Sequence, residues 1–310
     1  MLQKSAENRS REGNPIRKRR YIFTETFAAI AYAALYKATG EKQFDQRARD
    51  LFQLIVRHIT TPGLIPSKFT NYRPMRGLAV PMIMIITAQE LQKNLNDHSY
   101  TKYIDQYIYE IRNDFMKQNF KTVLETVGPH GEFIDHFDGR LITPGHAIEA
   151  AWFIMNEAIY RDMDRDLLDM GLTMLDWMWK LGWDDKYGGI LYFRDAKGLP
   201  VQEYWQDMKF WWPHNETIIA TLIAYSLTEN KKYQKWHKMV HDWTYDHFPD
   251  PEYGEWFGYL HRDGSISVPL KGNLWKGPFH IPRMQLNAWK LAESLKSGSE
   301  TNITSKKTPI

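Results

Sequence analysis

Hydrophobic periodicity divides this sequence into nine predicted helices of two kinds that alternate strictly along the chain. Five are apolar around most of their surface, near residues 21–38, 78–94, 145–161, 214–229 and 282–296. The four between them carry charged side chains on one face, near residues 43–60, 98–118, 164–182 and 231–248. Helices of the first kind are expected to be buried, and those of the second kind to lie at the surface. Alternating pairs of about 50 to 70 residues are typical of an all-α repeat, closed into a ring or left open as a solenoid.

Two short β-hairpins are predicted in the long loops between these helices. The first joins residues 189–194 to residues 201–204 through a Lys-Gly turn. The second joins residues 255–261 to residues 265–268. Its Asp-Gly turn is the stronger signal, because that dipeptide suits the backbone of a tight hairpin.

The two ends of the chain differ from the segment between them. Residues 1–20 are polar, and residues 21–297 are predicted to form one folded domain. The basic run at 17–20 is interpreted as a solvated stretch before a helix, since no basic stripe follows it. Residues 298–310 form a polar tail that is predicted to be disordered.

Charge and composition exclude several classes of function. A net charge of only +3 over 310 residues does not favour a nucleic-acid partner. No apolar run approaches the length of a membrane span, so no membrane partner is expected. The chain has no cysteine, which excludes disulfides and thiol chemistry and agrees with a cytoplasmic location. Aromatic residues make up 14% of the chain, and they suit sugar binding, although filling a helical core would also explain most of them.

A histidine stands at the start of three of the predicted inner helices. His146 lies in the segment PGHAIEAAW, His214 in KFWWPHNE and His280 in LWKGPFHIPR. A helix N-terminus disfavours the protonated imidazole, so these histidines are suited to act as bases. If the inner helices surround one axis, all three starts face the same cavity.

Three other interpretations of these motifs stay open. Each histidine can be a capping or core residue without a chemical role. A metal site with Glu149 or Glu216 is disfavoured, because the spacing differs from that of zinc enzymes. A glycoside hydrolase needs two carboxylates beside the cleaved bond, and Glu149, Glu216 and Glu255 are available. Histidines outnumber such carboxylate pairs in the motifs, which favours proton transfer at carbon.

Together, the motifs resemble those of the N-acylglucosamine 2-epimerase family, to which cellobiose 2-epimerases also belong. The resemblance covers residues 19–293 and includes RPMRGLAVPM at 73–82 and EYGEWFGYLHRDG at 252–264. It implies an (α/α)6 barrel, or α/α toroid. It also implies an isomerase that interconverts glucose- and mannose-configured sugars, with or without an N-acyl group, by proton transfer at C2. No cofactor and no metal are implied.

The resemblance assigns roles to particular residues. His146 and His280 correspond to the acid/base pair that removes and returns the C2 proton. Substrate contacts are implied for Glu149, Trp152, Trp212 and Glu216, and the further candidates are His214, Arg76 and Trp275. His214 is expected to matter less, because on a helix start its side chain points away from that of Glu216.

One segment of the family pattern is not matched. The family carries a Trp-Leu-Gln-Gly-Arg-Gln-like helix whose arginine binds the sugar oxygen and the enediolate-like intermediate, and no such segment precedes Tyr21. We therefore expect nine of the twelve helices of an (α/α)6 barrel, with the helix at 21–38 partly uncovered. A second copy of the chain or a separate N-terminal piece would cover it. The competing hypothesis is a non-catalytic, sugar-binding remnant of the family.

Overall fold

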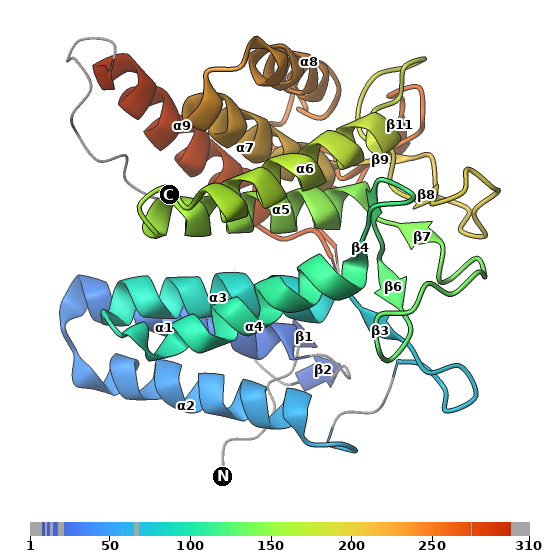
Figure 1. Ribbon diagram of the computed structural model, residues 1–310. Helices are drawn as coiled ribbons and strands as arrows, with labels where there is room; N and C mark the ends of the chain where they lie inside the picture. Colours follow the sequence, from blue (N-terminus) through green and yellow to red (C-terminus); the bar gives the residue numbers. More distant parts are fainter. Residues whose placement is uncertain are drawn as a thin grey trace. The chain divides into compact units, whose positions relative to one another are not determined.

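The computed structural model of the protein describes residues 8–9, 11–12, 15–17, 22–64, 68–273 and 275–298. Most of the polar segment 1–20, Tyr21 and residues 299–310 of the predicted tail lie outside the described residues. Nine α-helices occur in the described part of the chain (Figure 1). None of these helices combines the length and the apolar character needed to cross a lipid bilayer. Internal contacts divide the chain into two compact units, residues 1–111 and 112–310.

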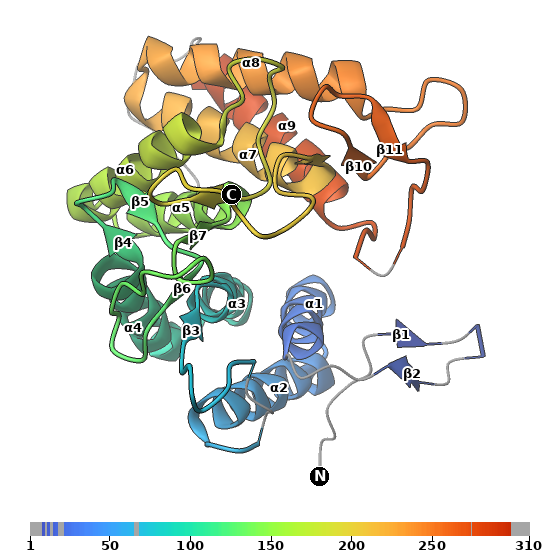
Figure 2. The ribbon, with the colours of Figure 1, turned by 90° about the vertical axis from the view of Figure 1, so that its right-hand side faces the viewer.

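The first unit is built from two pairs of helices. Its elements are β1 (Asn8–Arg9), β2 (Pro15–Arg17), α1 (Phe23–Thr39), α2 (Lys42–Thr60), β3 (Arg76–Gly77), α3 (Ala79–Leu95), a 3-10 turn at His98–Tyr100 and α4 (Thr101–Glu110). Helix α1 packs against α2 and α3, and α4 packs on α3 (Figure 2). Ten of the 17 residues of α3 are buried, but only four of the 17 in α1. The side chains of Phe27 and Leu35 are about two-fifths exposed, so the apolar helix α1 is partly uncovered, as the sequence predicts.

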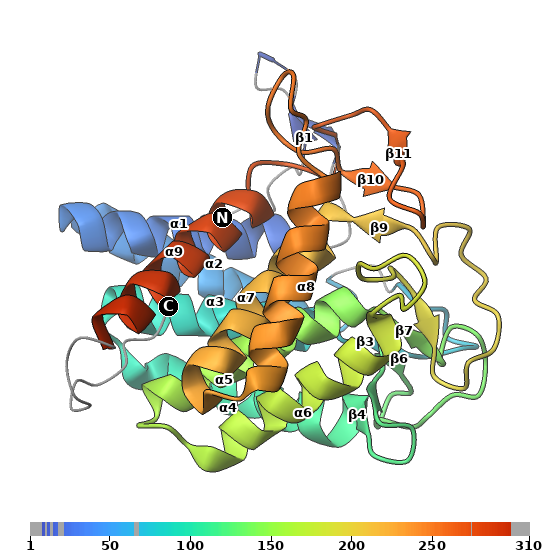
Figure 3. The same cartoon turned by 90° about the horizontal axis from the view of Figure 1, so that it is seen from above.

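The second unit repeats this arrangement with five helices. They are α5 (Pro144–Tyr160), α6 (Arg165–Gly182), α7 (Trp211–Thr228), α8 (Lys231–His247) and α9 (His280–Gly298). Helix α5 packs on α6 and α7, and α7 packs on α8 and α9 (Figure 3). In α7, 15 of 18 residues are buried, whereas in α8 only four of 17 are buried. The predicted alternation of inner and outer helices is therefore confirmed for α7 and α8. It is wrong for α9, which was predicted to be an inner helix: its main helix contact is with α7, and Leu286 and Trp289 are 45% and 60% exposed.

Local sequence signals set the helix starts that carry the predicted histidines. Pro144 is the first residue of α5, where its missing N–H removes no intrahelical hydrogen bond. Helix α7 begins at Trp211, three residues before the predicted start, and its first turn accommodates Pro213. Helix α9 begins at His280 itself. His146 is thus the third residue of its helix, His214 the fourth and His280 the first.

Short antiparallel strands connect the loops of the second unit. They are β4 (Met116–Lys117), β5 (Thr122–Val123), β6 (Thr126–Val127), β7 (Leu141–Ile142), β8 (Arg194–Asp195), β9 (Lys209–Phe210), β10 (Tyr259–Leu260) and β11 (Ile266–Val268). Strand β4 pairs with β5, β7 with β8, and β10 with both β9 and β11. The β10–β11 pair confirms the second predicted hairpin.

The first predicted hairpin is wrong. Residues 201–204, all of which the structure describes, form no strand, and β8 pairs instead with β7. Asp195 explains the difference, because its Oδ1 atom accepts hydrogen bonds from the backbone N–H groups of Lys197 at 2.8 Å and Leu199 at 3.2 Å. The Lys-Gly turn is therefore closed by this side chain together with the backbone bond from the N–H of Gly198 to the carbonyl of Asp195 at 3.0 Å.

Candidate active site

The indole ring of Trp212 lies beside the rings of two of the predicted histidines. Ring centroids are 4.8 Å apart for His146 and Trp212, and 5.8 Å apart for Trp212 and His280. Gly145 permits this packing, because a Cβ atom there would lie 2.7 Å from the ring of Trp212. The first turns of α5, α7 and α9 thus bring His146 and His280 to one aromatic side chain.

His146 is oriented by a glutamate from the strand segments before α5. Its Nδ1 atom lies 2.9 Å from Oε2 and 3.1 Å from Oε1 of Glu125, which stands between β5 and β6. The side chain of Glu125 is 11% exposed and that of His146 is 28% exposed. An ionised carboxylate only accepts hydrogen bonds, so the hydrogen of the neutral imidazole lies on Nδ1. Nε2 is then the ring nitrogen that is suited to take up a proton.

His280 has a matching partner on α7. Its Nδ1 atom lies 2.7 Å from Oε1 of Glu216, whose side chain is fully buried. The same tautomer follows, with the hydrogen on Nδ1 and Nε2 suited to take up a proton. The two histidines therefore have the same local chemistry, although their glutamates come from a loop in one case and a helix in the other.

Arg283 neutralises two buried glutamates next to His280. Its Nη2 atom lies 2.7 Å from Oε1 of Glu216 and also donates to Oε1 of Glu149. Oε2 of Glu216 accepts a hydrogen bond from Nε1 of Trp152 at 2.9 Å. Burial raises the pKa of Glu216, but Arg283 and His280 together outweigh burial and hold that pKa below its usual range. Glu216 is therefore ionised, and its Oε1 atom can only accept the hydrogen bond from Nδ1 of His280.

The same cluster has donor atoms that a divalent cation could use. Ligand atoms of Glu149, Glu216 and His280 all lie within 4.8 Å of one another. The guanidinium of Arg283 already supplies the positive charge, since it contacts both carboxylates. Burial lowers the pKa of Arg283, but Glu216 and Glu149 outweigh burial and raise it, so the group stays charged. Both carboxylates of the cluster are thus engaged in an ion-pair network with Arg283.

His214 is a core residue and stands apart from this network. Its Nε2 atom accepts from the backbone N–H of Ile190 at 2.9 Å, and its Nδ1 atom donates to the carbonyl of Phe210 at 2.6 Å. The residue is fully buried, and burial lowers its pKa to about 3. Because backbone groups use both ring nitrogens, His214 offers no ring nitrogen to a sugar. Its role is to connect the loop before β8 to α7.

Arg76 and Trp275 are the remaining predicted substrate contacts. Arg76 belongs to the first unit, where its Nη1 atom donates to Oε1 of Glu110 at 2.6 Å. Trp275 lies in the loop before α9, and its side chain is 63% exposed. Sugar contacts for Arg76 and Trp275 remain predictions. By contrast, Glu149, Trp152, Trp212 and Glu216 are joined to the histidines through the contacts described above.

Two residues of the network carry no role in the sequence analysis. Arg283 lies inside a quoted motif, three residues after His280 and so on the same face of α9, and that spacing was a usable signal. Glu125 had no such signal. It stands in a segment without helical or strand periodicity, and only the fold brings it to His146.

Solved structures with this arrangement of helices define the class of fold. A cellobiose 2-epimerase from Bacillus thermoamylovorans superposes with a TM-score of 0.76 at 20% identity, covering 91% of this chain and 74% of that one. A GH76 α-mannanase from Bacteroides thetaiotaomicron superposes with a TM-score of 0.64 at 12% identity, covering 89% and 70%. The protein is thus an all-α protein of the α/α-toroid class, as predicted.

Sequence comparison identifies the family within that class. The family model described as N-acylglucosamine 2-epimerase (GlcNAc 2-epimerase) matches residues 6–281. The N-acylglucosamine 2-epimerase of Bos taurus is 34% identical over 281 residues, which are 88% of this chain and 66% of that protein. The chain belongs to the N-acylglucosamine 2-epimerase family. It spans about two thirds of the length of the curated relative it matches.

Proposed function

We propose that this chain is a carbohydrate 2-epimerase that interconverts glucose- and mannose-configured sugars, with an N-acylglucosamine as the first substrate to test. The observation that carries the proposal is the pair His146 and His280. The Nδ1 atom of each histidine is hydrogen-bonded to a glutamate carboxylate, and the ring of each histidine lies beside that of Trp212. Family membership supports the same reaction, since the bovine relative is named for it.

Two such histidines suit proton transfer at C2 of the open-chain sugar. The carbonyl at C1 acidifies the C2 hydrogen, so a neutral imidazole can remove it as a proton. The electron pair then resides in an enediolate-like intermediate. Delivery of a proton to the opposite face of C2 gives the epimer. One C–H bond breaks and one forms without net oxidation, so the reaction needs no redox cofactor. Imidazole suits both directions, because it readily gains and loses a proton near neutral pH.

The roles of the neighbouring residues follow from their contacts. Glu125 and Glu216 fix the ring orientation of His146 and His280 and stabilise the imidazolium that each becomes after accepting a proton. Trp212 offers an apolar ring beside both histidines, against which the C–H face of a sugar can pack. Glu149 and Trp152 act through Arg283 and Glu216, to which they are hydrogen-bonded.

Deuterium exchange tests the proposal directly. The protein is incubated in D2O with N-acetylglucosamine, N-acetylmannosamine, glucose, mannose and cellobiose, and each sugar is followed by proton NMR. We expect loss of the C2 proton signal in at least one sugar, together with appearance of its epimer. His280→Ala serves as the matched control and should show neither change. The absence of exchange in every sugar would overturn the proposal.

The two alternatives from the sequence fit the geometry less well. A glycoside hydrolase needs two available carboxyl groups, but Glu149 and Glu216 both contact Arg283, and Glu255 forms an ion pair with Lys276 at 2.6 Å. A non-catalytic, sugar-binding remnant would bind one of the panel sugars without exchange. Calorimetric titration of the same sugars separates that outcome from inactivity.

A further inference from the structure

The backbone that carries Glu125 is held by the segment just before α5. The N–H group of Glu125 donates to the carbonyl of Leu141 at 2.9 Å. Next to it, Oγ1 of Thr126 donates to the carbonyl of Asp138 at 2.5 Å. The position of the Glu125 carboxylate, and so its contact with His146, therefore depends on where residues 138–141 lie.

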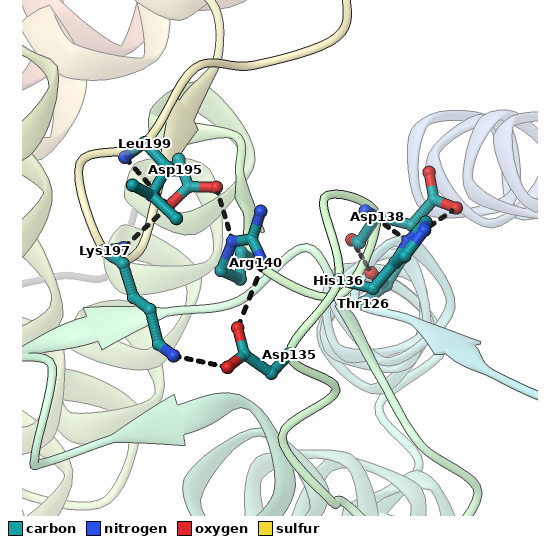
Figure 4. Close-up of polar contacts among 8 residues, drawn as sticks. All are labelled: Thr126, Asp135, His136, Asp138, Arg140, Asp195, Lys197 and Leu199. Carbon is teal, nitrogen blue, oxygen red and sulfur yellow. Dashed lines mark hydrogen bonds and ion pairs between the residues drawn. The ribbon is translucent and has the colours of Figure 1, made fainter.

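Those residues are held in turn by the loop that contains β8. Arg140 donates from Nε to Oδ2 of Asp195 at 2.8 Å, and its carbonyl accepts from the N–H of Ala196, also at 2.8 Å. Figure 4 shows the contact between Arg140 and Asp195. Strand β7, which contains Leu141, pairs with β8, which contains Asp195. The Asp195 side chain is 2% exposed and that of Arg140 is 14% exposed, so water screens their ion pair little.

We propose that Arg140 and Asp195 are positioning residues for epimerisation, because their ion pair fixes β7, β7 fixes Glu125, and Glu125 orients His146. This inference rests on the proposed function, in which His146 transfers a proton at C2. Among the described residues, neither Arg140 nor Asp195 forms a hydrogen bond or an ion pair with Trp212, His146 or His280. Their effect on the reaction is therefore indirect, through the Glu125 backbone.

A conservative variant can break this ion pair alone. In Asp195→Asn, the amide oxygen still accepts from the N–H groups of Lys197 and Leu199, which fixes the orientation of the amide. The amide nitrogen then faces Arg140 and cannot accept its hydrogen bond. We expect kcat for C2 exchange to fall about tenfold to 100-fold with KM nearly unchanged, since a displacement of about 1 Å has that effect on a reacting group.

Asp135→Asn is the matched control. Asp135 also contacts Arg140, at 3.0 Å, and Lys197, but its side chain is 58% exposed and lies outside the paired strands (Figure 4). We expect its kcat to stay within about twofold of that of the wild type, because exposed ion pairs contribute little. A loss of kcat as large as that of Asp195→Asn would overturn the inference, since general disturbance of the loop would then explain both.

A double-mutant cycle with Glu125→Gln shows whether the effect passes through Glu125. If it does, Asp195→Asn lowers kcat much less in the Glu125→Gln background than in the wild type. Independent, multiplying effects in the double variant would overturn the inference. So would wild-type kcat in Asp195→Asn.

An NMR readout keeps the inference testable without turnover. In protein labelled at histidine, the ring 15N shifts of His146 report its contact with Glu125, and His146→Gln identifies the signal. Asp195→Asn should move these shifts toward those of Glu125→Gln, and unchanged shifts would overturn the inference. Absence of C2 exchange in the wild type would count against the proposed function alone.

Discussion

The Nδ1 atom of His280 lies 2.7 Å from Oε1 of Glu216, a carboxylate that is fully buried and is also contacted by Arg283. Arg283 holds Glu216 in its ionised form, which can only accept a hydrogen bond. The neutral ring of His280 is thereby fixed in the tautomer with Nε2 unprotonated. In the proposed reaction, Nε2 is therefore the ring nitrogen of His280 that can accept a proton.

His146→Ala and His280→Ala should each lower the rate of C2 exchange by about 100-fold or more, because each removes a group that transfers a proton. Both side chains are partly exposed, so circular dichroism should show an intact fold. His214→Asn should keep measurable exchange, since backbone groups occupy both of its ring nitrogens. An inactive His214→Asn beside an active His280→Ala would show that the base pair is assigned wrongly.

Arg283→Met should destabilise the protein by about 3–5 kcal/mol, because it leaves the buried Glu149 and Glu216 facing each other without a cation. Urea unfolding measures the change. Adding Glu149→Gln to Arg283→Met should restore part of the loss by removing one uncompensated charge. If the double variant is no more stable than Arg283→Met, repulsion between the carboxylates is not the cause.

Arg112→Met is the control for that experiment. Arg112 also contacts a carboxylate, at 2.6 Å from Asp166, but the two side chains are 37% and 73% exposed. We expect a change of less than about 1 kcal/mol, because surface ion pairs are weak. A loss comparable to that of Arg283→Met would mean that burial does not distinguish the two sites.

The helices could be predicted from the sequence because their apolar residues recur at helical spacing. The observed bounds of α2 and α8 lie within one residue of the prediction. The prediction failed where the chain leaves the helix without a break in its hydrophobic pattern. The segment predicted as one helix at 98–118 is α4 flanked by a 3-10 turn, a π-helical turn at Ile111–Phe115 and strand β4. Pairing of β4 with β5 ends the helix, and that pairing is not visible in helical periodicity.

The candidate site was predictable only in part, for a related reason. A residue that shares a helix face with a motif histidine, such as Glu149 three residues after His146, could be found by spacing alone. Glu125 could not, because its contact with His146 joins two segments that are adjacent only in the folded chain. The pairing of β8 with β7 could not be predicted for the same reason. The ion pair beside it joins Arg140 and Asp195, which are 55 residues apart in the sequence.

Gly145→Ala should lower both stability and activity. Its added Cβ would lie 2.7 Å from the ring of Trp212 and 2.9 Å from Cβ of Pro213, so Trp212 must move away from His146. Overpacking of this kind costs about 1–3 kcal/mol. Gly272→Ala is the matched control, since the nearest atom, a backbone oxygen, lies at an ordinary 3.8 Å. Thermal unfolding and C2 exchange should separate the two variants, and equal behaviour would contradict the proposed packing.

Acid should destabilise the protein partly through His214, whose pKa burial lowers from 6.5 to about 3. Between these values the unfolded chain binds a proton at this residue and the folded chain does not. The free energy of unfolding is therefore unaffected by His214 above pH 6.5 and falls as the pH drops below it. At pH 5 the loss from this residue is about 2 kcal/mol, since each pKa unit corresponds to about 1.4 kcal/mol.

His237 titrates in the same range, because burial lowers its pKa to about 4, so the wild type alone cannot isolate the effect of His214. The comparison is with His214→Asn, which cannot titrate at this position. Asn at 214 should lower stability at pH 7.5, because it loses at least one of the bonds to Ile190 and Phe210. Between pH 7.5 and pH 5, however, the wild type should lose about 2 kcal/mol more than the variant in urea unfolding. Equal losses in the two proteins would show that His214 is not held neutral by the core.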